Sequence, residues 1–254
     1  MRVTFYSWKA DKIKRYGLVV ILALFCALLL WIGQWSQLPV FSNKGEPRAL
    51  SQGSAETPYV ALTFNISWGS EKVHEILKKL DAYNAHATFF VSGEWAERHP
   101  DILEDIHKGK HEIGMMGYKY ESYLEQEPAE VDTDLREAKA VFEKLGYKDL
   151  KWIRPPHGHF DKAVLKQIDK KGLQTVQWSI NPHDWENPGT NKIIDQIMEE
   201  GSKGDIILLH ASDSVKQTSK ALDVIIPGLK QKGLEFVSIT ELVNGGKSKT
   251  TQVQ

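Results

Sequence analysis

Short apolar runs alternate with helically spaced apolar residues along most of the chain. The runs are rich in β-branched and aromatic residues and are bounded by turn-forming residues, a pattern typical of buried β-strands. Seven such runs predict strands at Tyr59–Phe64, Ala87–Val91, His111–Gly114, Lys151–Arg154, Thr175–Ile180, Asp205–His210 and Glu235–Ile239.

Between these runs the apolar residues recur three and four positions apart, which predicts amphipathic helices. The first repeat consists of Val73, Ile76, Leu77 and Leu80 and follows Ser70, a candidate N-cap. Three further repeats lie within residues 135–145, 163–168 and 193–197, the second of them behind Asp161, and they stop at Gly146, Gly172 and Gly201.

Strict alternation of strands and helices predicts a parallel sheet covered by helices. Seven units over residues 59–243 give about 26 residues each, near the repeat of a (β/α) barrel but too few for eight units. An open doubly wound sheet is the alternative. The chain contains neither a dinucleotide-binding glycine fingerprint nor a phosphate-binding loop, which weighs against a nucleotide-binding form of that sheet.

The N-terminal region has the pattern of a membrane anchor. Residues 17–33 carry no charge, and a spanning helix needs about 17–25 apolar residues. Residues 1–16 are basic, so the positive-inside rule predicts a cytoplasmic N-terminus and an extracytoplasmic main domain. A cleaved signal peptide and a buried core helix are the alternatives, although no small-x-small cleavage site follows Ile32.

The remaining segments complete the predicted domain organisation. Residues 34–57 mix Gln, Ser, Pro, Gly and charged residues without periodicity, which is typical of a linker. We expect the main domain over residues 58–244 and a polar tail over residues 245–254.

Charge and cysteine content exclude several classes of function. The chain has a formal charge of −1, and residues 1–33 carry +4, which leaves −5 for the rest. An acidic main domain argues against nucleic acid as a partner, because phosphate binding needs a concentrated basic face. The single cysteine, Cys26, lies in the apolar N-terminal stretch. The main domain therefore has no disulfide, no cysteine zinc site and no cysteine nucleophile.

Polar and aromatic residues follow five of the predicted strands, where parallel α/β folds place their active sites. Taken singly, each has a structural explanation: Arg154 as the partner of a surface carboxylate, His210 as a core histidine, Asp184 as a turn cap. Together they indicate a functional rim, made of residues 65–69, 115–120, 154–159, 181–185 and 210–213.

These segments resemble, in order and spacing, the five motifs of the polysaccharide deacetylases of the NodB-homology type, carbohydrate esterase family 4. The resemblance covers nearly all of residues 58–243. The third motif is intact as Arg154-Pro155-Pro156-His157-Gly158, the fifth as Leu208-Leu209-His210, and the fourth keeps Asp184-Trp185. The first motif reads Thr63-Phe64-Asn65-Ile66-Ser67-Trp68-Gly69, and the second, after Lys110-His111-Glu112-Ile113-Gly114-Met115, has Met116 and Tyr120 at its histidine positions.

The resemblance implies a (β/α)7 barrel and the removal of N-acetyl groups from a peptidoglycan-type glycan. By position, Asn65 stands where the family has its catalytic base, and Arg154 is the residue that orients that base. His210 is the general acid and Asp184 holds it. The substrate-binding positions, which include the pocket for the acetyl methyl group, are Trp185, Leu208 and Pro156.

Four departures affect this chemistry. In the family a metal-bound water attacks the acetamide, and the metal, usually zinc, lowers the pKa of that water. Here Ile66, Met116 and Tyr120 replace an acid and two histidines, and Asn65 has no carboxylate to take up a proton. We therefore expect no zinc at the family position. The alternative of a divalent metal held elsewhere, by His157, His159, His183 or His210, remains open.

Three functions follow from this resemblance. The first is a polysaccharide deacetylase-like hydrolase with a degenerate metal site and an unusual mechanism. The second is a catalytically impaired glycan-binding protein on the same fold, and the third uses a relocated metal. The anchor, the Ile66–Gly69 turn and the Met-Gly-Tyr sequence at residues 116–118 resemble the sporulation-associated, PdaB-type subgroup. That likeness implies a role in forming or maintaining spores, with cell-wall or spore-cortex glycan as partner, and it leaves the oligomeric state open.

Overall fold

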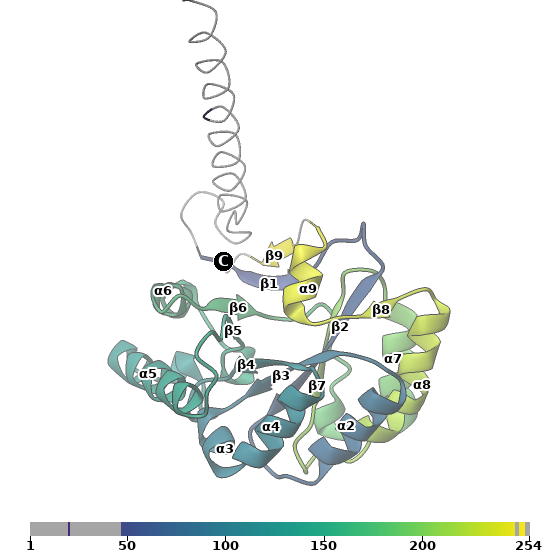
Figure 1. Ribbon diagram of the computed structural model, residues 1–254, viewed down its shortest axis with the longest axis horizontal. Helices are drawn as coiled ribbons and strands as arrows, with labels where there is room; N and C mark the ends of the chain where they lie inside the picture. Colours follow the sequence, from purple (N-terminus) through teal and green to yellow (C-terminus); the bar gives the residue numbers. More distant parts are fainter. Residues whose placement is uncertain (1–19, 21–46, 247–248, 252–254) are drawn as a thin grey trace, which may run out of the picture. The chain divides into compact units, whose positions relative to one another are not determined.

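The computed structural model describes residues 20, 47–246 and 249–251 (Figure 1). The chain divides into two units, residues 1–39 and 40–254, and the described residues lie almost entirely in the second. The predicted cytoplasmic segment 1–16 lies outside the described residues, as do the predicted anchor 17–33, apart from residue 20, and the linker up to residue 46. None of the helices in the described part of the chain has the length and apolar character that crossing a membrane requires.

The described strands of the second unit form one sheet in the order β7-β2-β3-β4-β5-β6-β1-β9, with β8 paired to β2. All pairs are parallel except β1 with β9. The bounds are β1 Ala49–Gln52, β2 Tyr59–Ile66, β3 Ala87–Val91, β4 Glu112–Met115, β5 Trp152–Ile153, β6 Gln174–Val176, β7 Ile206–His210, β8 Glu235–Phe236 and β9 Lys249–Thr251.

The sheet curls until the segment after β6 meets β7. Ile180 forms a parallel bridge to Ile207, and the Leu208 amide donates to the Ile180 carbonyl at 2.9 Å. An open doubly wound sheet has no such contact between distant strands. The predicted α/β class with a parallel sheet is therefore confirmed, and the curled sheet is consistent with the predicted (β/α)7 barrel.

Helices lie along the outside of the curled sheet (Figure 1). The apolar stripes predicted from the helical repeats supply most of the buried residues of α2, α5, α6 and α7, although Val131, Asp134 and Leu165 are buried as well. Along β2 the alternate residues Val60, Leu62, Phe64 and Ile66 join these stripes in the larger apolar cluster. The bounds are α2 Lys72–Ala82, α3 Gly93–Arg98, α4 Pro100–Lys108, α5 Pro128–Lys144, α6 Lys162–Lys170, α7 Thr190–Glu200, α8 Thr218–Gln231 and α9 Ile239–Asn244.

A second apolar cluster lies on the opposite face of the sheet and includes Leu50, Ala61, Phe90 and Met116. It also contains the three buried residues of α9, namely Ile239, Leu242 and Val243. Side chains alternate across a strand. Asn65, two strand positions after Thr63 and four after Ala61, therefore faces the inside of the curl, whereas Ile66 faces the helices.

Two short strands correct the predicted linker and tail. β1, within residues 34–57, pairs with β6, and β9, within residues 245–254, pairs with β1. Ala49 and Leu50 are fully buried. A strand with two apolar residues has no readable periodicity, and its pairing with β6 joins residues more than 120 positions apart.

Four predicted strands are shorter than expected. Lys151–Arg154 reduces to Trp152–Ile153, and Asp205–His210 begins at Ile206. Thr175–Ile180 reduces to β6 and the single bridge at Ile180. Glu235–Ile239 ends at Phe236 because Ser238 begins α9. The Ser238 hydroxyl accepts from the Glu241 amide at 3.2 Å, and the Glu241 carboxylate accepts from the Ser238 amide at 2.9 Å. This reciprocal cap fixes a helix start where apolar content alone predicts a strand.

The N-terminus of α2 is capped from a distant loop, not by Ser70 as predicted. Asp213 follows β7, and its carboxylate accepts from the amides of Ser70, Glu71 and Lys72 at 2.8–2.9 Å. Burial alone would raise the pKa of Asp213, but these three hydrogen bonds lower it. Asp213 thus ties the loop after β7 to the loop after β2.

We expect Asp213→Ala to lower the free energy of unfolding by about 1–2 kcal/mol, the usual cost of losing a helix cap. Because folding lowers the pKa of Asp213, its contribution is present above its ordinary pKa of 3.8 and is lost as the pH falls through the folded value. Urea unfolding at pH 7 measures the loss. Asp161→Ala removes one capping bond on α6 and is the comparison; an equal or larger loss there would contradict the role of Asp213.

Candidate functional site

A cavity of about 500 Å³ opens at the ends of β2 and β7, where the sequence predicts the functional rim. Its lining residues are polar or aromatic apart from Leu208 and Val215, and none of them is an acid, a lysine or an arginine. They are Asn65, Ser67, Tyr120, His157, His159, Trp178, Asn181, His183, Trp185, Leu208, His210, Ser212, Ser214 and Val215.

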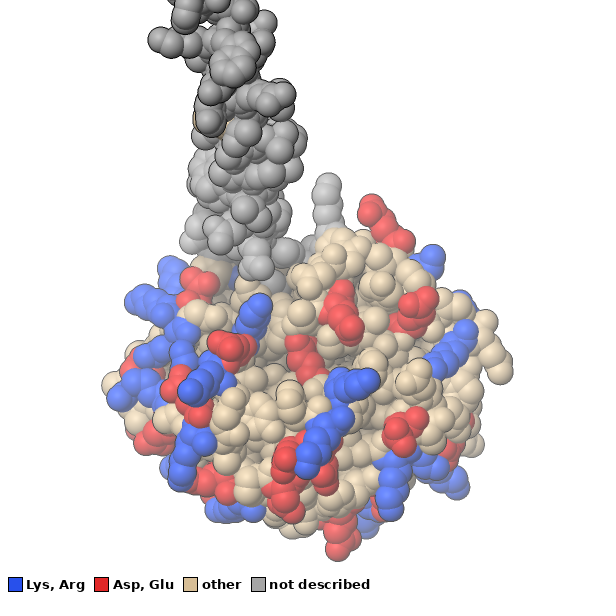
Figure 2. Space-filling model, in the orientation of Figure 1, with Lys and Arg blue, Asp and Glu red and all other residues tan. Residues whose placement is uncertain are grey.

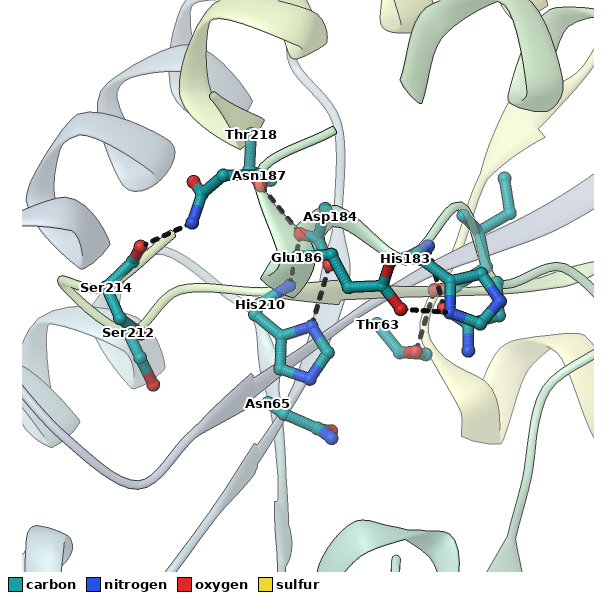
Figure 3. A network of polar contacts seen from close by, with 12 residues as sticks. Thr63, Asn65, His183, Asp184, Glu186, Asn187, His210, Ser212, Ser214 and Thr218 are labelled. Atoms are coloured by element: carbon teal, nitrogen blue, oxygen red, sulfur yellow. Dashed lines mark hydrogen bonds and ion pairs between the residues drawn. The ribbon is translucent and has the colours of Figure 1, made fainter. Parts of the chain in front are cut away.

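His210, which is partly exposed, and the buried Asp184 form a pair at one wall (Figure 3). Asp184 is fully buried, and its Oδ1 lies 2.7 Å from His210 Nδ1. Its Oδ2 accepts from the His210 amide at 2.8 Å and from the Thr218 hydroxyl at 2.6 Å. Because the carboxylate accepts at Nδ1, the ring carries its proton there and leaves Nε2 for the cavity. Figure 3 shows the ring pointing toward Asn65.

Asn65 and Arg154 form a second pair beside the first. Asn65 stands in register with His210 across the β2–β7 pairing. Arg154 is fully buried and donates from Nη1 to Asn65 Oδ1 at 3.0 Å. It also donates to the carbonyls of Val176 and Gln177 at 3.3 and 3.0 Å. The structural explanation of Arg154 as the partner of a surface carboxylate is wrong. Its guanidinium is buried and has no carboxylate partner among the described residues.

Aromatic rings enclose the Arg154 guanidinium. Its carbon lies 4.2 Å from the centre of the Phe90 ring and 5.4 Å from that of Trp178. Burial lowers the pKa of Arg154 to about 9, which still leaves it protonated at neutral pH. Gly158 is required beside it: its φ is +70°, and a Cβ atom there would lie 2.4 Å from the Trp178 ring.

The structure brings two of the three predicted substrate-binding residues to the cavity. Trp185 lines it and is 53% exposed, whereas Leu208 lines it and is 3% exposed. Together they offer an apolar wall with one solvent-facing aromatic surface. Pro156 is buried and does not line the cavity. The motif around Pro156 instead positions Arg154 and Gly158.

The three positions at which the family resemblance implies metal ligands do not suit zinc here. Ile66 has no donor atom and is packed among the helix-facing apolar residues. Met116 is fully buried in the inner apolar cluster. Tyr120 lines the cavity, and burial raises the pKa of its phenol, so it stays neutral. Zinc prefers imidazole, thiolate and carboxylate, and none of these is supplied.

Three other histidines reach the cavity without converging on one point. His157 is exposed and stacks on Tyr120, with ring centres 4.3 Å apart. His159 contacts Ser122 through Nδ1 at 3.0 Å, and His183 lies 3.4 Å from Glu186. Among the residues that the structure describes, no group of three or more His, Cys, Asp or Glu side chains is arranged to hold a metal ion.

Four residues of the site escaped the sequence interpretation. Ser214 and Val215 line the cavity just beyond the predicted rim segment 210–213. Thr218 begins α8 and donates to Asp184 across 34 positions. Trp178 lies within the predicted strand 175–180 and both lines the cavity and covers Arg154. The sequence signal that could have identified Trp178 is a large aromatic residue near the end of a predicted parallel strand. Thr218 carries no comparable local signal.

Comparison with known protein sequences identifies relatives of this chain. The sequence model described as polysaccharide deacetylase matches residues 52–176. A peptidoglycan-N-acetylglucosamine deacetylase of Bacillus cereus is 36% identical over 189 residues, which cover 72% of this chain and 87% of that protein. The uncharacterized protein YlxY of Bacillus subtilis is 29% identical over 200 residues, which cover 78% of this chain but 61% of YlxY.

A solved structure shares the fold. A pseudoenzyme of carbohydrate esterase family 4 from Bacillus anthracis superposes with a TM-score of 0.71 at 29% identity, covering 76% of this chain and 67% of that one. A mutant of that pseudoenzyme, described as having restored enzymatic activity, superposes with a TM-score of 0.71 over 76% of this chain and 70% of the mutant.

Proposed function

This chain belongs to the polysaccharide deacetylase family, and from that membership we propose that it binds the N-acetylated glycan of peptidoglycan and lacks the zinc-dependent hydrolysis that the family resemblance implies. One observation carries the proposal: the cavity keeps the parts that would hold an acetamide, while the positions for metal and base carry Ile66, Met116, Tyr120 and Asn65. We therefore propose that the chain is a glycan-binding protein with the fold of a carbohydrate esterase.

The cavity suits an N-acetylated sugar in size and polarity. Leu208 and Trp185 supply an apolar surface for the methyl group, and Trp185 is exposed enough to stack on a sugar ring. Asn65 and His210 supply hydrogen-bonding groups for the carbonyl and the amide. This combination of apolar lining and few placed polar groups is typical of small-ligand sites.

Hydrolysis needs an activated water in addition to a bound acetamide. The Asn65 amide cannot take up a proton, and no carboxylate lines the cavity among the described residues. The intact pair of Asp184 and His210 favours a second candidate, a slow metal-independent deacetylase in which Nε2 acts as the base. The named relatives include both a deacetylase and a pseudoenzyme, which is compatible with either candidate.

We expect the purified chain to bind N-acetylglucosamine oligosaccharides and Trp185→Ala to weaken that binding at least about tenfold, because stacking on an aromatic ring is lost. Isothermal titration calorimetry measures the affinity. Trp68→Ala is the matched control, since Trp68 is 63% exposed but does not line the cavity.

An acetate-release assay with and without a chelator separates the candidates. Binding without acetate release supports the binding protein, and chelator-insensitive release that His210→Ala abolishes supports the second candidate. If neither variant nor wild type binds the oligosaccharide, the proposed function is wrong.

We further propose that residues 17–33 anchor the chain in a membrane, with residues 1–16 cytoplasmic and the curled sheet outside. The support is the uncharged stretch and its basic flank. The likeness to the sporulation-associated subgroup leads us to propose cell-wall or spore-cortex glycan as the partner. Protease added to intact cells should degrade residues 59–243; protection until lysis would reverse the orientation.

A further inference from the structure

Three tyrosines lie close together on the segment that follows β4, and each has a different environment. Tyr118 donates from its phenol to the exposed carboxylate of Glu97 at 3.3 Å. Tyr123 is buried and donates to Asp134 at 2.6 Å. Tyr120 lies between them in the sequence and lines the cavity at the ends of β2 and β7, whereas the other two do not. Of the three phenols, that of Tyr120 is therefore the one placed to meet a ligand.

Asp134 on α5 holds this segment on both sides of Tyr120. Its buried carboxylate accepts from the backbone amides of Tyr118 and Lys119 at 2.9 and 2.8 Å. The hydroxyl of Tyr123 donates to the same carboxylate. The position of Tyr120 at the cavity is thus set by hydrogen bonds that tie its neighbours along the chain to a helix.

The phenol of Tyr120 accepts one hydrogen bond and keeps its proton. Its ring stacks on His157 and packs against the inner apolar cluster, and the backbone of His157 hydrogen-bonds to the phenol oxygen. Burial raises the pKa of Tyr120, although this hydrogen bond and the charge of Arg154 act in the opposite direction. The phenol is therefore neutral at pH 7, and no described residue accepts its proton. A phenol can donate as well as accept, so this donor is left for a ligand.

We propose that Tyr120 donates a hydrogen bond to the acetyl carbonyl of the bound glycan and thereby determines its preference for N-acetylated sugars. The inference rests on the proposed function, because it names the residue that recognises the acetamide in that cavity. Tyr120 stands at a second-motif position, where the family resemblance implies a metal-binding histidine. A neutral donor thus occupies a position at which the resemblance implies a metal ligand.

An amide carbonyl matches the donors that the cavity presents. A carbonyl oxygen has two lone pairs and cannot donate. The Tyr120 phenol supplies one donor. Asn65 supplies a second from Nδ2, because a guanidinium can only donate and the atom that faces Arg154 at 3.0 Å is therefore the amide oxygen Oδ1. A sugar hydroxyl, which has a proton of its own to donate, fits such a pair of donors less well.

Tyr120→Phe removes the donor and keeps the ring that stacks on His157. Tyr118→Phe is the matched control, because it makes the same change in the same segment and its phenol contacts Glu97 outside the cavity. Calorimetry with the full chain and an N-acetylglucosamine oligosaccharide should show about three- to tenfold weaker binding for Tyr120→Phe, the usual effect of one hydrogen bond. Tyr118→Phe should change the affinity by less than about twofold.

The carbonyl of the ligand gives a second readout, which a purely structural role of Tyr120 would not move. The oligosaccharide is labelled with carbon-13 at its acetyl carbonyls, and NMR spectra are recorded with each protein saturated. Because a hydrogen bond draws electron density from the carbonyl carbon, its signal moves to higher frequency. We expect this displacement in the wild type and in Tyr118→Phe, and a smaller one in Tyr120→Phe.

Each outcome has one meaning. Equal affinities of the two variants would overturn Tyr120 as the donor and leave glycan binding intact. Weaker binding by Tyr120→Phe with an unchanged carbonyl signal would also overturn it, since the ring position alone would then explain the loss. Complete loss of binding in Tyr120→Phe would contradict it as well, because one hydrogen bond cannot account for that much. Failure of the wild type to bind the oligosaccharide would instead overturn the proposed function.

Discussion

A variant with Asn65→Asp, Ile66→Asp, Met116→His and Tyr120→His is expected to release acetate from N-acetylglucosamine oligosaccharides at least about a hundredfold faster than the wild type. A chelator should stop the reaction. Catalytic zinc takes three protein ligands, which the last three substitutions supply, and the first restores a base beside Arg154. The pair of Asp184 and His210 is already in place to protonate the leaving amine.

The substitutions should act as a unit. Asn65→Asp alone should give little activity, because a base without a metal-bound water has almost nothing to deprotonate at neutral pH. Omitting Ile66→Asp leaves two ligands and weak zinc binding. Strong non-additivity is therefore expected in acetate release, as for other groups that function together.

Ile66 decides whether this variant succeeds. Its side chain is fully buried among the helix-facing apolar residues, so a carboxylate there must turn toward the cavity or remain as an unpaired buried charge. The latter costs several kcal/mol. Thermal melting with and without zinc measures this cost, and His210→Ala in the variant is the activity control. A folded, zinc-loaded and inactive variant would contradict the prediction.

Acid should destabilise the protein between about pH 6.5 and pH 4 through His111. The residue is 6% exposed, its Nδ1 has no hydrogen-bond partner among the described residues, and the centre of its ring lies 5.3 Å from that of Phe89. Burial, with a smaller contribution from the nearby His86, lowers the pKa of His111 from 6.5 to about 4. The unfolded chain therefore binds a proton that the folded chain refuses in this interval.

The sign follows from this difference. The contribution of His111 to the free energy of unfolding is highest above pH 6.5 and falls as the pH drops toward 4. Below pH 4 this histidine contributes no further change. A shift of this size corresponds to roughly 3 kcal/mol. His111→Leu should flatten this part of a urea-unfolding profile, whereas His74→Leu, at an exposed site on α2, should leave it unchanged. An unaltered slope in His111→Leu would rule out this histidine as the cause.

The two acid-sensitive groups act in different pH intervals. Asp213 has a lowered pKa and contributes stability that is lost only below about its ordinary value of 3.8. His111 acts above that range. A profile with both variants therefore separates the contributions that these two side chains make to the acid transition.

Residues adjacent along the chain determined much of the fold. Ala87–Val91 is a strand with the predicted bounds, because five consecutive apolar or β-branched residues suit a strand buried on both faces. Gly146 and Gly172 follow helices as predicted, since each takes a positive φ that other residues avoid. Alternation of these elements was enough to predict a parallel α/β sheet with its site at the strand ends.

Contacts between distant residues lay beyond the sequence pattern. Asp213 caps α2 across more than 140 positions, and β1 pairs with β6 across more than 120. Asn65 and Arg154 meet across 89. No local propensity records such pairs, because the partner of a hydrogen bond or an ion pair is chosen by the closed fold.

The sequence by itself determined which residues reach the rim: Asn65, Arg154, Asp184 and His210 are all at the ends of buried segments, where the backbone period places them. Only the tertiary structure decided what each of them does there. It buries Arg154 without a carboxylate, fixes the Asn65 amide with its donor outward, and encloses Asp184 behind His210. The physical reason is that periodicity determines the direction of a side chain, whereas its charge, protonation and partners depend on what the folded chain brings within about 3 Å.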